Sequence, residues 1–272
     1  MLLNKYELIS YISNGEFGTV IKAQYNNKHY AIKCGAKELI KYEIQMYKQL
    51  RSINNISTIY DVFEINNKMY MVMDLYTMTL VDYKLNNYEH TNYIIRTISI
   101  IKDLIAIIKL IHENNIIHRD LKPTNICLDT NYKLYLIDFG ISKIYRINNI
   151  HNSETQIKSL LGSVNFSSLN VLNLIEPSRR DDIESLLYIL FYLLLNKENY
   201  CTYDNLNAST KKNIDIIILF LQDKSNNLLI NKNINYSTLI KLFKYIRRLK
   251  YNQVPNYDYI IILINESFIL AI

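Results

Sequence analysis

Hydrophobic positions along the chain change their spacing near Asp74. Before this residue they fall in short runs, which predict β-strands. The predicted strands are 6–12, 20–25, 30–34, 58–63 and 69–73. One stretch, 37–51, has helical spacing instead, and the residues that set it are Leu39, Ile40, Ile44, Tyr47 and Leu50. This part of the chain is predicted to form a small antiparallel sheet with one helix.

From Asp74 onward the spacing is mostly helical. The predicted helices are 91–113, 179–196, 210–222, 236–249 and 257–270. The longest apolar stretch, 185–195, is too short to cross a bilayer and is predicted to form a buried core helix. Strands followed by helices predict the α+β class, with two lobes and a cleft between them.

Length and composition agree with one globular domain. A chain of 272 residues can bury a large core, and 49% hydrophobic with 21% charged residues is ordinary for a globular protein. Five glycines and three prolines leave no sign of a low-complexity linker. The 24 tyrosines, the absence of tryptophan and the abundance of Ile, Asn and Lys indicate an AT-rich genome, such as that of some large DNA viruses or parasites.

Charge and cysteines bear on partners and location. The formal net charge of +6 favours acidic partners, but a generally basic surface without a particular partner explains it equally well. No segment signals direct binding of nucleic acid or membrane. Lys5 and Glu7 interrupt the first apolar run, which argues against a signal peptide. We expect an intracellular protein, in the cytoplasm or nucleus, because three widely spaced cysteines suggest neither disulfides nor zinc: Cys34, Cys127 and Cys201.

Two short motifs carry candidate chemistry. Residues 118–125 read His-Arg-Asp-Leu-Lys-Pro-Thr-Asn, and residues 138–140 read Asp-Phe-Gly. Together, in this order and each beside an apolar stretch, they have the pattern of protein kinases. In that pattern Asp120 is the catalytic base and Lys122 neutralises charge on the transferred phosphoryl group. The predicted ligands of Mg²⁺ are Asn125 and Asp138.

Structural roles compete with these assignments. Asp138 precedes a glycine and fits a tight turn as well as a metal site. His118 is predicted to be a packed structural histidine rather than a proton shuttle.

Upstream, residues 13–20 read Ser-Asn-Gly-Glu-Phe-Gly-Thr-Val between two predicted strands. Gly15 and Gly18 allow the backbone to approach phosphate oxygens, although this pattern alone is typical of any glycine-containing hairpin. Lys33, on the next strand, is predicted to hold the α- and β-phosphates of ATP, with Glu43 on the following helix orienting it. A solvent-facing lysine and a solvated helix face are the ordinary alternatives.

Longer segments resemble one family of protein kinases, the casein kinase I family. They are Gly-Ser-Val-Asn-Phe-Ser-Ser-Leu-Asn at 162–170, Glu-Pro-Ser-Arg-Arg-Asp-Asp-Ile-Glu-Ser-Leu at 176–186, Tyr-Ile-Arg-Arg-Leu at 245–249 and Pro-Asn-Tyr-Asp-Tyr at 255–259. The resemblance implies a bilobal kinase fold with ATP and Mg²⁺ in the cleft. It also implies a single domain over 1–272, with a small lobe at about 1–74, a hinge at about 74–77 and a large lobe at about 78–272.

The resemblance implies roles for single residues as well. Ser163 matches the hydroxyl that bridges the catalytic aspartate and lysine, and Asp182 matches the buried aspartate that anchors the catalytic loop. Tyr47, His118 and Phe139 match three members of the hydrophobic column that aligns the lobes. The implied ATP-binding positions are Ile12, Gly15, Gly18, Val20, Ala31, Lys33, Glu43, Met73, Asp74, Leu75 and Cys127.

The chain departs from the family at three places. Ser13 stands where the family has a glycine, and the segment between Lys33 and Glu43 is short. Asn165 replaces a basic residue that reads a phosphate or acid upstream of the target residue, while Lys158 and Arg179 match other basic positions of that site. Preference for acidic or phosphate-primed substrates is therefore expected to be weakened. The pair 179–180 fits a solvated helix start as well as a phosphate site, and the sequence does not decide between them.

The resemblance predicts an active, monomeric Ser/Thr protein kinase acting on protein substrates. The main alternative is a pseudokinase, a kinase-shaped module that regulates a partner. Loss of any one of four residues would favour it, and all are present: Lys33, Asp120, Asn125 and Asp138. A kinase of small molecules is opposed by 162–170, which shapes a peptide site in the family. The family is generally active without loop phosphorylation, and we expect the same despite the candidate phosphosites Ser142, Ser153, Thr155 and Ser159.

Overall fold

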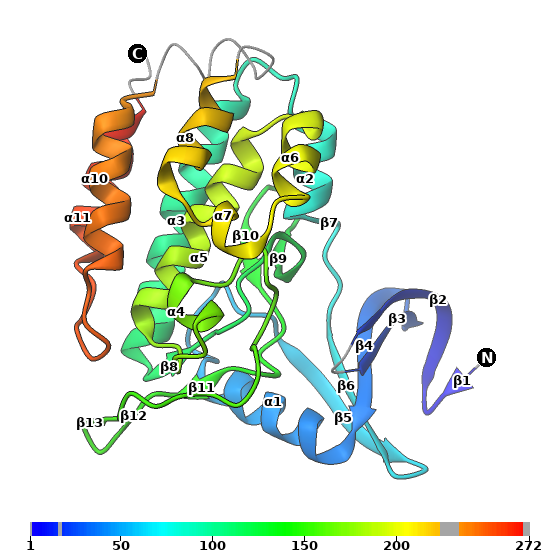
Figure 1. The fold of residues 1–272 in the computed structure, drawn as a ribbon. Coiled ribbons are helices and arrows are strands. Elements are labelled where there is room, and N and C mark those ends of the chain that lie inside the picture. Colours follow the sequence, from blue (N-terminus) through cyan, green and yellow to red (C-terminus); the bar gives the residue numbers. More distant parts are fainter. Residues whose placement is uncertain (1, 16–17, 224–233, 269–272) are drawn as a thin grey trace. The chain divides into compact units, whose positions relative to one another are not determined.

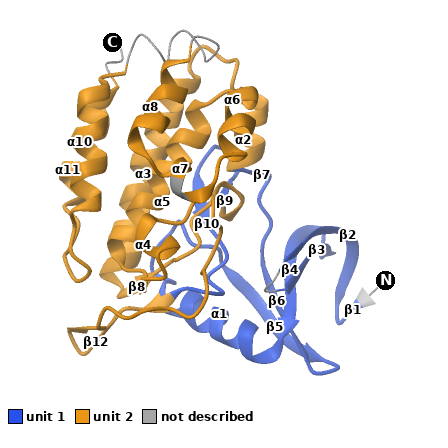
Figure 2. Ribbon diagram, viewed as in Figure 1, with its two compact units in different colours: residues 1–79, 126–142 blue, residues 80–125, 143–272 orange. Residues whose placement is uncertain are grey.

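The computed structural model describes residues 2–15, 18–223 and 234–268. The chain forms two compact units, coloured separately in Figure 2. Unit 1 comprises Met1–Thr79 and Ile126–Ser142, and unit 2 comprises Leu80–Asn125 and Lys143–Ile272. The predicted limits of the single domain and of its lobes stay a prediction.

Unit 1 is built on a six-stranded antiparallel sheet (Figure 1), and all five predicted strands are confirmed. Two of its hairpins turn at Asn-Asn pairs, 26–27 and 66–67, whose positive φ angles suit tight turns between antiparallel strands. In spatial order the strands are β1 (Leu2–Leu3), β2 (Tyr6–Gly15), β3 (Gly18–Tyr25), β4 (Lys28–Ala36), β6 (Lys68–Asp74) and β5 (Ile59–Ile65).

The two faces of this sheet carry different residues, because side chains alternate along each strand. One face buries Ala23, Ile32 and Val72 in a core cluster with Tyr6. The predicted helix is confirmed as α1 (Lys37–Gln49). A second, three-stranded sheet in unit 1 has the order β10 (Leu134–Leu136), β9 (Ile126–Leu128) and β7 (Met78–Thr79).

Unit 2 is mainly helical. Four predicted helices are confirmed, and among them α3 packs against α5 and α10 packs against α11 (Figure 1). Every residue from Asp181 to Leu194 is buried, so the apolar stretch does form a core helix. In the described ranges no helix has the length and apolar character needed to cross a membrane. The four helices are α3 (Tyr93–Glu113), α5 (Arg179–Leu194), α10 (Tyr236–Arg247) and α11 (Tyr257–Ser267).

The last backbone carbonyl groups of a helix have no partner within the helix, and at the C-terminal end of α5 they are buried. Side chains of α3, of α2 (Leu80–Asn87) and of the residue after α2 donate hydrogen bonds to them. Lys84 Nζ donates to the Tyr192 carbonyl at 2.5 Å. The hydroxyls of Tyr93 and Tyr88 donate to the next two carbonyls, those of Leu193 and Leu194, at 2.9 and 3.3 Å. These contacts allow α5 to end inside the core.

One predicted helix is divided. Where 210–222 was expected to be continuous, α7 (Ala208–Lys211) and α8 (Ile214–Gln222) are separate helices. The Asn213 side chain accepts a hydrogen bond from Asp215 N and so starts a new helix. The predicted helix at 257–270 ends at Ser267, and residues 269–270 lie outside the described residues. Not predicted were α2, α4 (Leu169–Leu172), α6 (Lys197–Asp204), the 3-10 turn η1 (Pro123–Asn125) and the short strands β1, β7, β11 (Lys143–Ile144), β12 (Arg146–Ile147) and β13 (Ile150–His151). The apolar stretches beside the two motifs form β8 (Ile116–Ile117) and β10, and Cys127 lies on β9.

Candidate active site

In unit 1 a buried lysine lies between two carboxylates. Lys33 Nζ, on β4, is 2.8 Å from Glu43 Oε2 on α1 and 2.7 Å from Asp138 Oδ1. Burial by itself favours the neutral amine, but the two neighbouring negative charges outweigh it and raise the pKa of Lys33. The ammonium therefore persists at neutral pH. The alternatives of a solvent-facing lysine and a solvated Glu43 are wrong, since both side chains are buried.

Asp138 directly precedes a turn, in which Ser142 N donates to the Phe139 carbonyl at 3.2 Å, and its side chain reaches Lys33. Its φ angle is 66°, in the left-handed region, and its N–H donates to the Tyr47 hydroxyl at 3.1 Å. Phe139 is fully buried and packs edge-to-face on Tyr47, with ring centroids 5.0 Å apart. The turn and the candidate metal-ligand role predicted for Asp138 are thus compatible.

The glycine hairpin joins β2 to β3. Gly15 and Gly18 are paired across it, and Glu16 and Phe17 between them lie outside the described residues. Gly18 has a φ angle of 138°, and a Cβ there would come within 2.3 Å of the Cys34 carbonyl oxygen. Only glycine fits this position without a shift of β4.

Several predicted ATP-binding residues share the second face of the six-stranded sheet. The register pairs Val20 with Lys33 and Ala31 with Met73, which places the four side chains on one face. Asp74 accepts hydrogen bonds from Thr58 N and from the Tyr60 hydroxyl.

The remaining predicted ATP-binding positions lie elsewhere in unit 1. Ile12 is exposed on β2, and Leu75 follows β6. Cys127 is buried on β9 of the three-stranded sheet.

In unit 2 the loop 118–125 is anchored from α5. The Asp182 carboxylate accepts hydrogen bonds from the backbone N–H groups of His118 and Arg119 at 2.8 and 3.0 Å. Burial alone would raise the pKa of Asp182, but the bonds from His112 and from the backbone hold it below its ordinary value. Asp182 therefore stays ionised and fixes the loop. His118 is fully buried, as predicted for a packed histidine.

Asp120 is the hub of this loop. Its Oδ1 accepts hydrogen bonds from Ser163 N and from Ser163 Oγ, both at 3.1 Å. Its Oδ2 accepts from Lys122 Nζ at 2.6 Å and from Asn125 Nδ2 at 3.2 Å. The structure thus brings together the four predicted site residues of unit 2. A Cβ on Gly162 would come within 2.7 Å of the Arg119 carbonyl oxygen, which explains the glycine before Ser163.

A cavity of about 330 Å³ lies beside these residues in unit 2. Aromatic and apolar side chains alternate in its wall with the polar groups of the loop. Its lining is Val81, Lys122, Pro123, Thr124, Ser163, Val164, Asn165, Phe166, Tyr192 and Tyr200.

The two basic residues expected to read a substrate phosphate, Arg179 and Lys158, differ in their surroundings. Arg179 is buried, and its guanidinium donates to the Asn252 carbonyl at 2.6 Å and to the Tyr145 hydroxyl at 3.3 Å, so the expectation of a substrate-facing Arg179 is wrong. Arg179 does begin α5, but its burial means that the alternative of a solvated helix start is wrong for this residue. Asn165 Oδ1 accepts from Lys211 Nζ at 2.8 Å. Lys158 is exposed.

Sequence reasoning missed Glu176. This buried carboxylate is 3.2 Å from Arg119 Nη1 and 2.9 Å from Lys143 Nζ. Arg119 directly precedes Asp120, so Glu176 holds the arginine of the loop from a residue far along the chain. The only signal in the sequence was an acidic residue just before a proline and a helix N-cap, and this signal does not indicate which residue the acid would contact.

Unit 1 holds a lysine between two carboxylates, and unit 2 holds a carboxylate that accepts hydrogen bonds from lysine and serine. These are the groups predicted for phosphoryl transfer to a hydroxyl. Residues 6–256 match the protein kinase domain family. Over 276 aligned residues the chain is 30% identical to a probable casein kinase I homolog from Encephalitozoon cuniculi (strain GB-M1), which covers 97% of this chain and 85% of that relative. The chain belongs to the protein kinase family, in agreement with the predicted fold class, and within it resembles casein kinase I.

Proposed function

We propose that this protein is an active Ser/Thr protein kinase, which transfers the γ-phosphate of ATP to hydroxyl groups of protein substrates. The observation that carries the proposal is the setting of Asp120, a buried carboxylate bonded on one oxygen by Ser163 and on the other by Lys122. A pseudokinase would not need this arrangement. The similarity to a casein kinase I homolog supports Ser and Thr as acceptors.

Asp120 would orient the substrate hydroxyl by accepting its hydrogen bond. Four donors already surround the two oxygens of this carboxylate, which has about four acceptor positions. We therefore infer that Lys122 turns from Asp120 to the γ-phosphate when ATP binds. That movement opens Oδ2 to the hydroxyl and adds a positive charge where negative charge develops.

Mg²⁺ suits two of the predicted residues. Carboxylate and amide oxygens are the hard ligands that this ion prefers, and Asp138 and Asn125 offer one each. The Asn125 amide nitrogen donates to the Asp120 carbonyl at 2.9 Å, which leaves its oxygen as the atom to face a metal. When bound, Mg²⁺ neutralises charge on the phosphates. Lys33, oriented by Glu43, would hold the α- and β-phosphates.

The substrate site favours targets that carry no priming phosphate. Asn165 is neutral, its Oδ1 is engaged by Lys211, and Arg179 is committed to internal contacts. The cavity beside Asp120 has apolar and aromatic walls. Among Lys158, Asn165 and Arg179, Lys158 is the exposed cation, so acidic residues of a substrate retain one favourable contact.

We further propose that the kinase acts as a monomer inside the cell. The free thiols Cys34, Cys127 and Cys201 suit a reducing compartment.

The test uses three peptides that differ only in the acceptor, Ser, Thr or Tyr, each made with and without a phosphoserine upstream. The proposal expects transfer to Ser and Thr, little transfer to Tyr, and less than about a threefold gain in kcat/KM from the phosphoserine. Preference for Tyr would contradict the acceptor class, and a large gain from the phosphoserine would contradict the reading of Asn165.

A further inference from the structure

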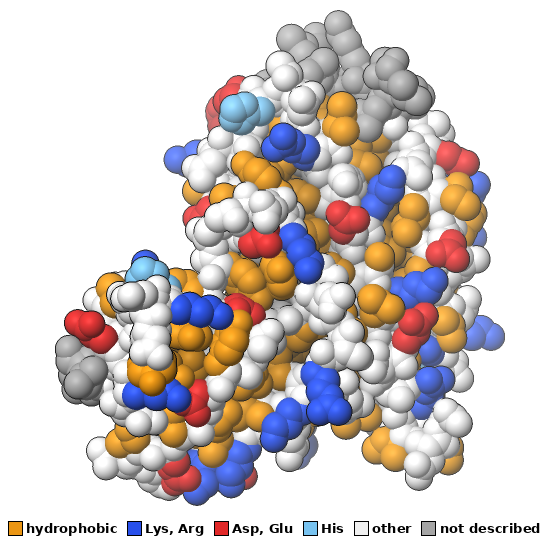
Figure 3. Space-filling view, turned by 180° about the vertical axis from the view of Figure 1, so that it is seen from behind, with side chains coloured by type: hydrophobic (Ala, Val, Ile, Leu, Met, Phe, Trp, Pro, Cys, Tyr) orange, Lys and Arg blue, Asp and Glu red, His pale blue; other side chains and the backbone are white. Residues whose placement is uncertain are grey.

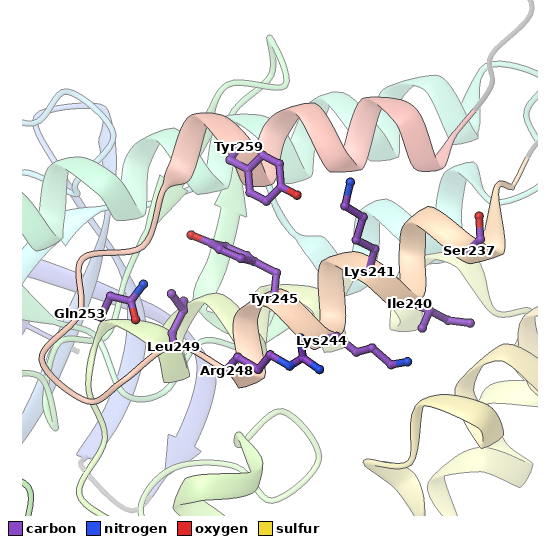
Figure 4. A pocket seen from close by; sticks show the side chains of 9 residues that line it. All are labelled: Ser237, Ile240, Lys241, Lys244, Tyr245, Arg248, Leu249, Gln253 and Tyr259. Carbon is purple, nitrogen blue, oxygen red and sulfur yellow. The ribbon is translucent and has the colours of Figure 1, made fainter.

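Two adjacent ridges of α10, continued by its C-cap Arg248 and by Leu249, form an open cavity on unit 2 (Figure 4). Positions four apart lie on one side of a helix, so each ridge is a row of such positions. With Gln253 and Tyr259 the ridges line a cavity of about 480 Å³. One ridge is Ser237, Lys241, Tyr245 and Leu249, and the other is Ile240, Lys244 and Arg248.

The cavity is lined by three exposed cations, Lys241, Lys244 and Arg248. In the described part of the chain, no ion pair joins a carboxylate to Lys241, Lys244 or Arg248. Their neighbours behave differently, since Arg247 pairs with Glu184 at 3.2 Å and Lys109 pairs with Asp258 at 3.6 Å. Figure 3 shows positive and negative side chains interspersed on another view of the surface. What sets these three cations apart is that they line one cavity together.

The wall of the cavity is firm as well as charged. The rings of Tyr245 and Tyr259 meet edge-to-face, with centroids 5.1 Å apart. Tyr245 is further held by a hydrogen bond from Asn256 N to its hydroxyl at 2.9 Å. Lys241 Nζ lies 5.8 Å from the centroid of Tyr259, between α10 and α11 in Figure 4. A ligand here would meet a preformed surface, which lowers the cost of ordering on binding.

This cavity shares no lining residue with the one beside Asp120. It is thus a separate feature of unit 2, and its side chains can be changed without touching the predicted machinery.

We propose that this cavity is a docking site for a short acidic segment of a protein substrate or partner, a step that rests on the proposed protein kinase function. Charge complementarity selects an acidic chain, and the size selects a short one. From Lys241 to Arg248 the helix rises about 10 Å, the reach of three or four residues of extended peptide. Three cations are few for nucleic acid, whose binding draws on roughly six to ten phosphate contacts.

The first measurement is polarisation of a fluorescein-labelled hexaglutamate peptide mixed with the full chain, without ATP. The test variant is Lys241→Gln, Lys244→Gln and Arg248→Gln together. Its matched control removes three exposed lysines from elsewhere, Lys48→Gln, Lys68→Gln and Lys197→Gln. We expect the test variant to weaken binding by about tenfold, the control to change it by less than about twofold, and salt to weaken wild-type binding.

The second measurement is phosphorylation of one serine peptide with and without a hexaglutamate extension. The test variant should raise KM for the extended peptide, leave kcat unchanged and leave the short peptide unaffected. Equal polarisation binding by test and control variants would overturn the proposal. Tighter binding of single-stranded DNA, lost in the same variant, would overturn the choice of an acidic protein segment. The binding assay needs no catalysis, so the two proposals can fail separately. A chain without phosphotransfer activity would contradict the proposed function, and peptide binding would still test the docking site.

Discussion

At the scale of single residues, the charges of the candidate site are held by neighbours rather than by solvent. Lys33 keeps its ammonium because Glu43 and Asp138 stand within 2.8 Å of it. Asp182 keeps its carboxylate because His112 and backbone N–H groups bond to it. Each of these charges is buried, so removal of one partner would leave an uncompensated charge in the interior and destabilise the fold.

Lys33→Met and Asp138→Asn are expected to fold and to lose at least about 100-fold in kcat, because Lys33 would hold the phosphates directly and Asp138 would hold the Mg²⁺ that neutralises their charge. The measurement is ATP turnover with Mg²⁺, alongside circular dichroism to check folding. Lys48→Met, on the exposed side of α1, is the control and should stay near wild type. Near-normal turnover in either folded variant would show that the assigned roles are wrong.

Residue identities could be predicted where a motif names them, and less well where contacts come from far along the chain. Asp120, Lys122 and Ser163 were grouped from sequence alone and do lie together. Glu176 was missed because nothing near it in sequence indicates Arg119 as its partner. Arg179 was misread because its burial depends on a distant carbonyl group.

At the scale of elements, the loop carrying Asp120 is fixed from two sides. The start of α5 bonds its backbone through Asp182, and Glu176 bonds the Arg119 side chain. In many kinases a phosphate on a loop residue meets the arginine before the catalytic aspartate. Here an internal carboxylate stands in that position, which gives a physical reason for activity without loop phosphorylation.

Phosphatase-treated enzyme from bacteria is therefore expected to stay active when assayed before it can autophosphorylate. Glu176→Gln should lower kcat on the order of tenfold, since a loosened Arg119 lets the loop shift. Ser142 is fully buried and so is a poor acceptor, whereas Ser153, Thr155 and Ser159 are exposed. A stripped wild-type enzyme that is silent until one of these exposed residues is phosphorylated would contradict the expectation.

The packing of α2 on the end of α5 buries Lys84, and we therefore expect the stability of the protein to depend on pH. Burial lowers the pKa of Lys84 from 10.5 to about 7. Between these values the unfolded chain binds more protons than the folded one, so the free energy of unfolding rises with pH, by up to about 1.4 kcal/mol per pH unit from this group. Lys84→Met should lose that rise between pH 7 and 10 and show a flatter curve than wild type. Urea unfolding across this range measures it, and parallel curves for the two proteins would count against it.

Element predictions succeeded where hydrophobic spacing was long and regular. The strands of unit 1 and helices such as α3 and α10 have such spacing. The short helices α2 and α6 lack such spacing, because they have too few buried side chains to produce a helical pattern in the sequence. Helices this short are marginal alone and depend on packing against the rest of the unit. The break before α8 came from a capping asparagine inside an otherwise helical pattern.

At the scale of the whole molecule, residues predicted to serve one reaction are distributed over two units and most of the sequence. Lys33 and Asp138 belong to unit 1, and Asp120 and Ser163 belong to unit 2. The order of strands and then helices predicted the α+β class, and the family match over residues 6–256 agrees with it. The return of 126–142 to unit 1 could not be predicted, because pairing of β9 with β7 joins residues far apart in the chain.

The central claim is that this chain catalyses phosphoryl transfer and that Asp120 serves the reaction. The most direct measurement is transfer of radiolabelled γ-phosphate from ATP and Mg²⁺ to casein by wild type and by Asp120→Asn, prepared in parallel and shown to be folded. We expect steady incorporation on Ser and Thr by wild type and a rate lower by at least about 100-fold in the variant. Equal rates, or no incorporation by wild type above the variant, would contradict the claim and favour a kinase-shaped binding module.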